Sequence, residues 1–512
     1  MSFAKVHSAQ INGLKAQIIK VETDITSGLY SFSLVGLPDK GVEESRDRVS
    51  AAIKNTGYTS PKSRNNKITV SLAPAEIRKE GPVFDLPIAI SYLIASGDID
   101  INLDDSLLIG ELSLKGDLES IRGVLPIAEA AKRAGFKKIY LPFENKEEAA
   151  LIEGINVYGV KSLRELIDHL EGTNVLSPAK VTQIDYELPS THVDMRDIKG
   201  QESAKRALLI AAVGGHNICM YGPPGTGKTM LAKSFASILP PLSREQIFEV
   251  SGIHSIVGNR KLVTYPPYRA PHHTASNVSL VGGGSTPKPG EITLAHHGVM
   301  FMDEFPEFST ETLEALREPL EDGKVTITRA RGSVTYPARF ILVAAMNPCP
   351  CGNAGNKDKQ CICRPLDIER YEKKISGPIM DRIDMWIQVS NIKYNDLSSL
   401  PDGLDSDTAR SIIKKARNIS IKRNSQSVSD KLSESNKEIL NRDLNGTMIE
   451  KHIHIAPDVV ETLNTMARQF ALSPRAYHRV LRVSRTIADI DGATDVSHNH
   501  IIEAFQYRPK VR

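Results

Sequence analysis

Eight residues near the middle of the chain have the types and spacing of a phosphate-binding loop. They are Gly222, Pro223, Pro224, Gly225, Thr226, Gly227, Lys228 and Thr229. Glycines let successive backbone N–H groups curl around phosphate oxygens, and a helix N-terminus adds partial positive charge. In this pattern Lys228 reaches the β- and γ-phosphates, and Thr229 offers its hydroxyl to Mg²⁺. The loop therefore predicts binding of ATP with Mg²⁺, in preference to a glycine-rich turn with an incidental Lys-Thr pair.

Polar side chains end two further apolar runs. Asp303 and Glu304 follow the run 298–302, about 75 residues after the loop, and Asn347 follows the run 340–346. We expect Asp303 to hold Mg²⁺ through water and Glu304 to orient and deprotonate the attacking water. We expect Asn347 to position that water or to touch the γ-phosphate. The spacing from the loop disfavours the alternative, a strand followed by a surface acidic turn.

Four of the five cysteines fall within fifteen residues, as two C-x-C pairs. The pairs are Cys349 with Cys351 and Cys361 with Cys363. Four thiolates on two short knuckles can surround one Zn²⁺ ion tetrahedrally, so we predict a structural zinc site. Disulfide bonds are the alternative, which a cytosolic location disfavours.

The hydrophobic pattern predicts the elements that must position these groups. The run 217–221 reads as a buried strand before the loop and 230–236 as the helix after it; 298–302 and 340–346 read as further strands. From about 395 the pattern becomes helical, over 407–418, 457–467, 476–489 and 496–507. The fold class is therefore α/β with a helical C-terminal region.

The three strand ends resemble the core of AAA+ ATPases, in which a P-loop, an acidic pair and a polar sensor meet. The resemblance implies that Ile198 lies against the adenine. The run 376–384 resembles the finger motif of the AAA+ branch that includes magnesium chelatases and MCM helicases, so Arg382 is expected to reach a neighbouring subunit's γ-phosphate. Arg475 matches the second sensor, beside the subunit's own ATP. A surface salt bridge is the alternative for both arginines.

A long segment, 268–297, separates the loop from the acidic pair and contains two His-His pairs, 272–273 and 296–297. We interpret these histidines as structural or loop residues rather than metal ligands. By its position the segment resembles the helix-interrupting insertion of the chelatase and MCM branch, which projects towards a ring pore.

Two β-rich runs within 324–336 predict a hairpin with Arg329 and Arg331 at its tip. In the resembled helicases the corresponding hairpin points into the pore, so these two arginines are candidates to track a DNA backbone. A solvated hairpin is the alternative.

The first 170 residues alternate strand and helix patterns. The stretches 79–90 and 123–142 resemble the proteolytic domain of Lon proteases, in which a serine nucleophile and a lysine base act together. Val83 and Leu125 stand at those positions here and supply neither a hydroxyl nor an amine. We therefore expect a Lon-like α+β fold without peptidase activity, used for assembly or DNA contact; a packing domain is the alternative.

Composition bounds the class of protein. Of the 512 residues, 40% are hydrophobic and 24% charged, no apolar run reaches membrane-spanning length, and the N-terminus lacks a signal peptide's apolar core. We expect a soluble cytoplasmic protein. The formal net charge of +3 means that any DNA site must be a local basic patch. We divide the chain into a Lon-like domain (1–172), a linker (173–192), an AAA+ core (193–394) and a helical lid (395–512).

Taken together, the runs 269–274 and 347–352 and the Lon-like N-terminus resemble the bacterial YifB/ComM family of magnesium-chelatase-like ATPases. The resemblance implies a hexameric ring that uses ATP and Mg²⁺ to move DNA, as a helicase promoting branch migration in homologous recombination and natural transformation. Two alternatives remain: a magnesium-chelatase motor subunit, which the Lon-like domain and the cysteine cluster disfavour, and a protein-remodelling ATPase or protease.

Overall fold

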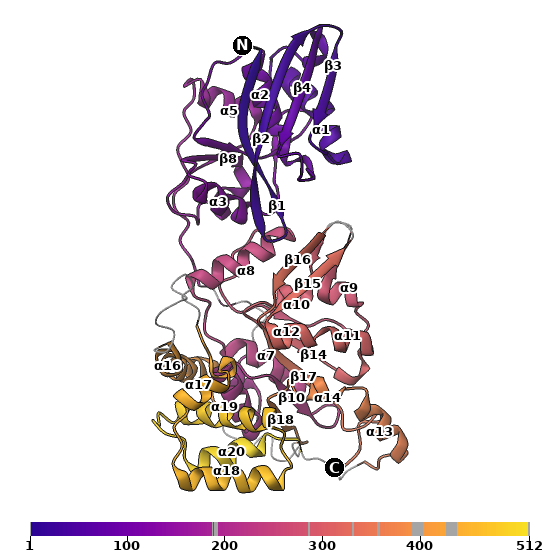
Figure 1. The fold of residues 1–512 in the computed structure, drawn as a ribbon, viewed down its shortest axis with the longest axis vertical. Coiled ribbons are helices and arrows are strands. Elements are labelled where there is room, and N and C mark those ends of the chain that lie inside the picture. The colour runs from indigo at the N-terminus through magenta and orange to yellow at the C-terminus, as the bar shows by residue number, and fades with distance from the viewer. Residues whose placement is uncertain are drawn as a thin grey trace. The chain divides into compact units, whose positions relative to one another are not determined.

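The chain divides into two compact units in the computed structural model. The first contains residues 1–185 and 244–263, and the second contains 186–243 and 264–512 (Figure 1). The structure describes residues 2–186, 188, 193–284, 287–329, 332–355, 359–391, 403–425 and 438–509. Residues 244–263, which we assigned from the sequence to the ATPase core, thus group with the first unit.

The first unit is built on a seven-stranded mixed sheet in the order β3-β4-β2-β1-β5-β8-β9. Its strands are β1 (Phe3–Asn12), β2 (Lys15–Ser27), β3 (Ser31–Val35), β4 (Asn66–Ala73), β5 (Ser106–Leu108), β8 (Lys138–Pro142) and β9 (Asn156–Val160), with a small pair β6 (Glu111–Leu112) and β7 (Leu118–Glu119). Its helices are α1 (Lys40–Asn55), α2 (Asp85–Ala95), α3 (Val124–Arg133), α4 (Lys146–Ala149), α5 (Leu163–Leu170) and α8 (Arg244–Ile256).

Side chains alternate across this sheet, so each face has its own core. Leu107 belongs to the cluster with α3 and α4, and Leu108 to the cluster with α1, α2 and α5. Val83 and Leu125 both pack in the cluster of α3, among apolar side chains. No protease dyad therefore stands at these positions, whereas the Lon-like character of the unit stays a prediction.

The second unit is built on a five-stranded parallel sheet in the order β11-β14-β17-β10-β18. These strands are β10 (Ile218–Tyr221), β11 (Tyr268–Arg269), β14 (Val299–Met302), β17 (Ile341–Met346) and β18 (Met385–Gln388). Around them lie α6 (Glu202–Gly214), α7 (Lys228–Ile238), α11 (Thr310–Ala315), α12 (Arg317–Asp322), α13 (Pro365–Lys373) and α14 (Gly377–Met380). The predicted α/β core is confirmed.

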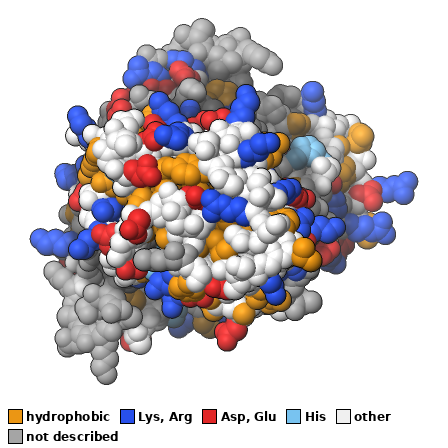
Figure 2. All heavy atoms as spheres, turned by 90° about the horizontal axis from the view of Figure 1, so that it is seen from above, with side chains coloured by type: hydrophobic (Ala, Val, Ile, Leu, Met, Phe, Trp, Pro, Cys, Tyr) orange, Lys and Arg blue, Asp and Glu red, His pale blue; other side chains and the backbone are white. Residues whose placement is uncertain are grey.

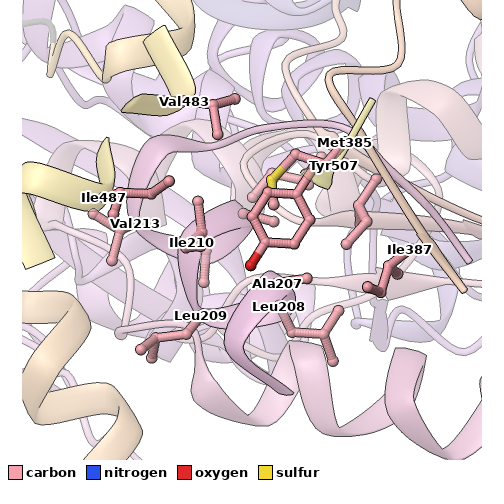
Figure 3. Packing of buried hydrophobic residues seen from close by; sticks show 14 of the residues in the cluster. Ala207, Leu208, Leu209, Ile210, Val213, Met385, Ile387, Val483, Ile487 and Tyr507 are labelled. Atoms are coloured by element: carbon pink, nitrogen blue, oxygen red, sulfur yellow. The ribbon is translucent and has the colours of Figure 1, made fainter. Parts of the chain in front are cut away.

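The C-terminal region is helical, as predicted. It consists of α16 (Ser406–Ser425), α17 (Gly446–His452), α18 (Pro457–Gln469), α19 (Pro474–Ile490) and α20 (His498–Gln506). Figure 3 shows that α19 contributes Ile487 to the same packing as Ile210 of α6 and Met385 of β18. The C-terminal helices and the five-stranded sheet therefore share one apolar cluster, which holds α19 against the α/β core.

The segment before β14 contains α9 (Asn277–Val281), the pair β12 (Gly282–Gly283) and β13 (Lys288–Pro289), and α10 (Glu291–Leu294). The predicted hairpin is confirmed as β15 (Lys324–Arg329) and β16 (Gly332–Pro337). Arg331 and the side chain of Arg329 lie outside the described residues. Among the helices described, none combines the length and the apolar character needed to cross a membrane.

Candidate nucleotide site

The loop between β10 and α7 has a backbone that requires its glycines. Gly225 and Gly227 adopt φ values of +80° and +88°, in the left-handed region that glycine favours. A Cβ on Gly222 would lie 2.1 Å from the carbonyl oxygen of Val389. Gly227 is the N-cap of α7, so the loop delivers its backbone N–H groups to the start of that helix.

Lys228 turns back into this loop. Its Nζ donates hydrogen bonds to the carbonyl oxygens of Gly222 at 2.7 Å and Pro223 at 2.8 Å, and to Oδ1 of Asn347 at 3.2 Å. Burial lowers the pKa of Lys228. The ammonium and the sensor amide predicted from the sequence are therefore in direct contact, where both can reach one phosphate group.

Thr229 and Asp303, the two residues predicted to hold Mg²⁺, are in direct contact. The hydroxyl of Thr229 donates to Oδ2 of Asp303 at 2.9 Å. The strands β10, β17 and β14 are neighbours in parallel, so Thr229, Asn347 and Asp303 come together at the carboxyl edge of the sheet. A hydroxyl and a carboxylate are oxygen ligands that suit Mg²⁺, and the donor set fits that ion.

Glu304 has an unusual backbone and a partner that the sequence analysis missed. Its φ is +50°, in the left-handed region, and its N–H donates to Oδ1 of Asp303 at 3.0 Å. Its Oε2 lies 3.2 Å from Nδ1 of His273. From the sequence we interpret His272 and His273 as structural or loop residues. The parallel pairing of β11 with β14 brings the chain after β11 to the edge where Glu304 stands, and a two-residue strand gives almost no sequence pattern by which to predict this.

Arg382 and Arg475 line one cavity of about 500 Å³. Arg339, Arg442, Arg479 and Arg482 line it too, so it is rich in guanidinium groups. Arg382 donates to the carbonyl oxygen of Pro378 at 2.7 Å and pairs with Glu321. Its pKa is lowered by burial first and then by the charges of Arg317, Arg475 and Arg479.

This placement of Arg475 differs from the expected one. We expected it beside the subunit's own ATP, but the residues lining its cavity include neither the P-loop nor Asp303, Glu304 or Asn347. The reason is tertiary: α19 is held by its packing against α6, and Arg475 stands at its exposed N-terminal end.

The remaining predicted residues lie as follows. Ile198 is buried in the apolar cluster of the second unit, and Gln201, three residues later, donates to the carbonyl oxygen of Thr226 at 3.5 Å. The segment thus reaches the loop, while the adenine contact of Ile198 stays a prediction. The four predicted zinc ligands converge, with all four sulfur atoms within 4.8 Å of one another.

Comparisons with protein families cover most of the chain. The model described as magnesium chelatase, subunit ChlI, matches residues 194–397. A second, for subunit ChlI of Mg-chelatase, matches 21–145, and a third, for the C-terminal part of subunit ChlI, matches 403–508. The second of these falls within the unit that we expected to be Lon-like.

Two relatives match over almost their whole length, and a third matches over part of it. The uncharacterized protein YifB of Salmonella typhimurium is 41% identical, over 99% of this chain and 97% of its own. The competence protein ComM of Haemophilus influenzae is 40% identical, over 100% of this chain and 98% of its own. The DNA replication licensing factor mcm7-B of Xenopus laevis is 26% identical over 43% of this chain and 32% of its own.

Proposed function

Because the chain belongs to the YifB/ComM family of magnesium-chelatase-like AAA+ ATPases, we propose that it forms a ring that hydrolyses ATP to move DNA. The proposal rests on one observation: the residues expected to form a single ATP site lie at two separate locations on the subunit. The loop, Asp303, Glu304 and Asn347 meet at one edge of the sheet, and Arg382 and Arg475 line a cavity elsewhere.

Each residue at the edge of the sheet has a role in hydrolysis. Lys228 neutralises the β- and γ-phosphates and Asn347 orients the terminal one. Glu304 takes the proton of the attacking water, with His273 holding its carboxylate. Thr229 and Asp303 would hold Mg²⁺, which neutralises phosphate charge when bound.

The second of these two locations is the cavity lined by guanidinium groups. The cavity that Arg382 and Arg475 line includes Asn217, at the amino end of β10, whereas the loop follows the carboxyl end of that strand, so we propose that both arginines act on ATP that a neighbouring subunit binds. Positive charges held ready there stabilise the charge that develops on the transferred phosphoryl group. If every subunit supplies these arginines to its neighbour's ATP, the subunits close into a ring. The resemblance to the family implies that this ring is a hexamer.

DNA as the substrate is supported by the relatives and by the hairpin. ComM is named as a competence protein and mcm7-B as a DNA replication factor. The strands β15 and β16 form a hairpin, and we propose that Arg329 and Arg331, which the sequence predicts at its tip, contact phosphates. On the described part of the face in Figure 2, acidic, basic and apolar side chains are interspersed. We propose branch migration during recombination and natural transformation as the activity.

The test is ATP turnover by the purified chain, without DNA and with forked or four-way-junction DNA, at stated salt concentrations. We expect DNA to stimulate turnover and the junction to be migrated. Turnover that DNA leaves unchanged, with no junction migrated, would instead favour a chelatase-type motor or a protein-remodelling ATPase. The variant Glu304→Gln is the matched control, because it should bind ATP and DNA without moving the junction.

A further inference from the structure

The four clustered cysteines have the spacing of a tetrahedral metal site. Sγ of Cys349 lies 3.4 Å from Sγ of Cys351 and 3.7 Å from Sγ of Cys361, and Sγ of Cys351 lies 3.6 Å from Sγ of Cys361. Four sulfurs around one zinc with Zn–S bonds of roughly 2.3 Å have S···S edges of about 3.8 Å. A disulfide needs about 2.05 Å, and all five cysteines of the chain are free.

Backbone groups around the cluster complete the outer shell of such a site. The N–H of Ala354 points at Sγ of Cys349 at 3.2 Å, and the N–H of Cys351 points at Sγ of Cys363 at 3.4 Å. N–H donors of this kind stabilise the negative charge of thiolates and orient metal ligands. The donor set therefore fits a thiolate-bound zinc ion.

The same segment contacts the nucleotide site at two points. Asn347, which accepts a hydrogen bond from Lys228, stands two residues before Cys349. Gly352 follows Cys351 and adopts φ +78°, and a Cβ there would lie 2.6 Å from Cδ of Pro224 in the P-loop. The first knuckle thus has the sensor amide on one side and packs against the phosphate loop on the other.

The second knuckle leads to a third point of contact. Cys363 is followed by α13, which carries Tyr371. Burial raises the pKa of the Tyr371 phenol, and the backbone N–H of Asn347 lies close enough to that phenol to lower its pKa against this larger rise. Tyr371 is buried. From Asn347 the chain runs through both knuckles into α13, and Tyr371 brings it back beside Asn347. An ion that joins the two knuckles therefore braces this stretch of chain from within.

We propose that Cys349, Cys351, Cys361 and Cys363 bind one zinc ion that holds Asn347 and Pro224 in place, so that nucleotide binding and hydrolysis depend on the metal. The hydrolysis part rests on the ATPase function proposed above. Without the ion the two knuckles are joined only by the chain and by the contact of the Cys351 N–H with Sγ of Cys363, and Asn347 loses one of the supports that keep its amide against Lys228.

The experiment uses the full-length chain purified without added metal. We expect one zinc per chain by elemental analysis and four thiols protected from a thiol reagent. Removing the zinc with a chelator under reducing conditions, followed by restoring Mg²⁺, should weaken binding of a fluorescent ATP analogue and lower turnover, each by roughly tenfold or more. Adding zinc back should restore both.

Two variants separate the ligand role from general damage to the loop. Cys361→Ser removes one ligand and should behave like the stripped protein. Ile362→Ser alters the neighbouring side chain, which is 85% exposed, and should keep zinc, affinity and turnover. Hydrogen exchange of residues 222–229 and 347–355 should increase in Cys361→Ser and stay unchanged in Ile362→Ser.

Three outcomes would overturn the proposal: fresh protein without zinc, stripped protein that binds and hydrolyses ATP normally, or exchange at 222–229 that does not respond to the metal. A chain that holds zinc but hydrolyses no ATP would contradict the proposed function instead. In that case affinity for the nucleotide analogue still tests the metal dependence.

Discussion

Nδ1 of His273 lies 3.2 Å from Oε2 of Glu304, so an imidazole holds the carboxylate that we assign as the general base. The pair joins the acidic strand end to the chain that leaves β11 and continues into the segment of α9 and the β12–β13 pair. That segment is therefore connected through His273 to the residue that we propose as the general base.

We predict that His273 positions Glu304. His273→Ala should lower kcat by about 10–100-fold with little change in KM, because the carboxylate proposed to activate water would be misplaced while ATP contacts remain. His273→Asn, which keeps a hydrogen-bond donor, should recover part of the loss. His272→Ala is the control, since Nδ1 of His272 is bound to the hydroxyl of Thr274. Equal losses in all three variants would indicate a structural role.

Glu304→Gln should bind ATP with near-normal affinity but hydrolyse it about 10²–10⁴-fold more slowly, because an amide cannot accept the proton of water. Binding is measured with a fluorescent analogue and hydrolysis by phosphate release. Asp303→Asn provides the contrast: it weakens the pair with Thr229 and should reduce Mg²⁺-dependent binding as well. Near-normal turnover by Glu304→Gln would refute the assignment of the base.

Mixing inactive subunits tests whether Arg382 and Arg475 act in trans. Arg382→Ala and Arg475→Ala should each lower turnover about 10²–10³-fold alone. Each should regain turnover when mixed with Lys228→Ala, because an intact loop then meets intact arginines at some interfaces. Mixing Arg382→Ala with Arg475→Ala should give no recovery, since every interface lacks one arginine. If Arg475 served its own nucleotide, its mixture with Lys228→Ala would stay inactive.

Glu148 in the first unit gives a pH-dependent prediction. Burial raises the pKa of Glu148, and hydrogen bonds from Ser255, Asn145 and the N–H of Leu125 oppose this. The folded state therefore binds the proton more tightly than the unfolded state. The stabilisation is complete below the unfolded pKa of about 4.3 and is lost as the pH rises through the higher folded value.

The stability of the wild type relative to Glu148→Gln should therefore decrease as the pH rises from about 4 towards neutrality. Hydrogen exchange of the α3 amides measures this locally, because the single tryptophan, Trp386, lies in the second unit. Glu129→Gln, on the exposed side of α3, should leave the profile unchanged. A wild type that gains relative stability with rising pH would show that Glu148 is stabilised in its charged form.

Local patterns with strong chemical constraints were predictable from the sequence. Each of these patterns occupies a few consecutive residues: the loop at Gly222–Thr229, the pair Asp303 and Glu304, and the knuckles at Cys349 and Cys361. In the structure Thr229 contacts Asp303, and the four cysteines converge. Asn347 was predictable because it ends a long apolar strand.

Relationships set by tertiary packing were not predictable in this way. The contact of His273 with Glu304 depends on the pairing of β11 with β14, and the position of Arg475 depends on how α19 packs against α6. Neither leaves a periodic pattern in its own segment. The assignment of residues 244–263 differed for the same reason, since an amphipathic helix does not specify which core it covers.

Helix α8, within residues 244–263, limits how the two units can be deleted or exchanged by genetic events. A domain encoded by one uninterrupted stretch can be deleted, duplicated or exchanged by a single genetic event. The first unit cannot, because α8 is encoded inside the second: losing residues 1–185 would strip Phe248 and Leu262 of the apolar cluster on which they pack. A single deletion of residues 1–185 therefore cannot remove the first unit without exposing apolar side chains that remain in the chain.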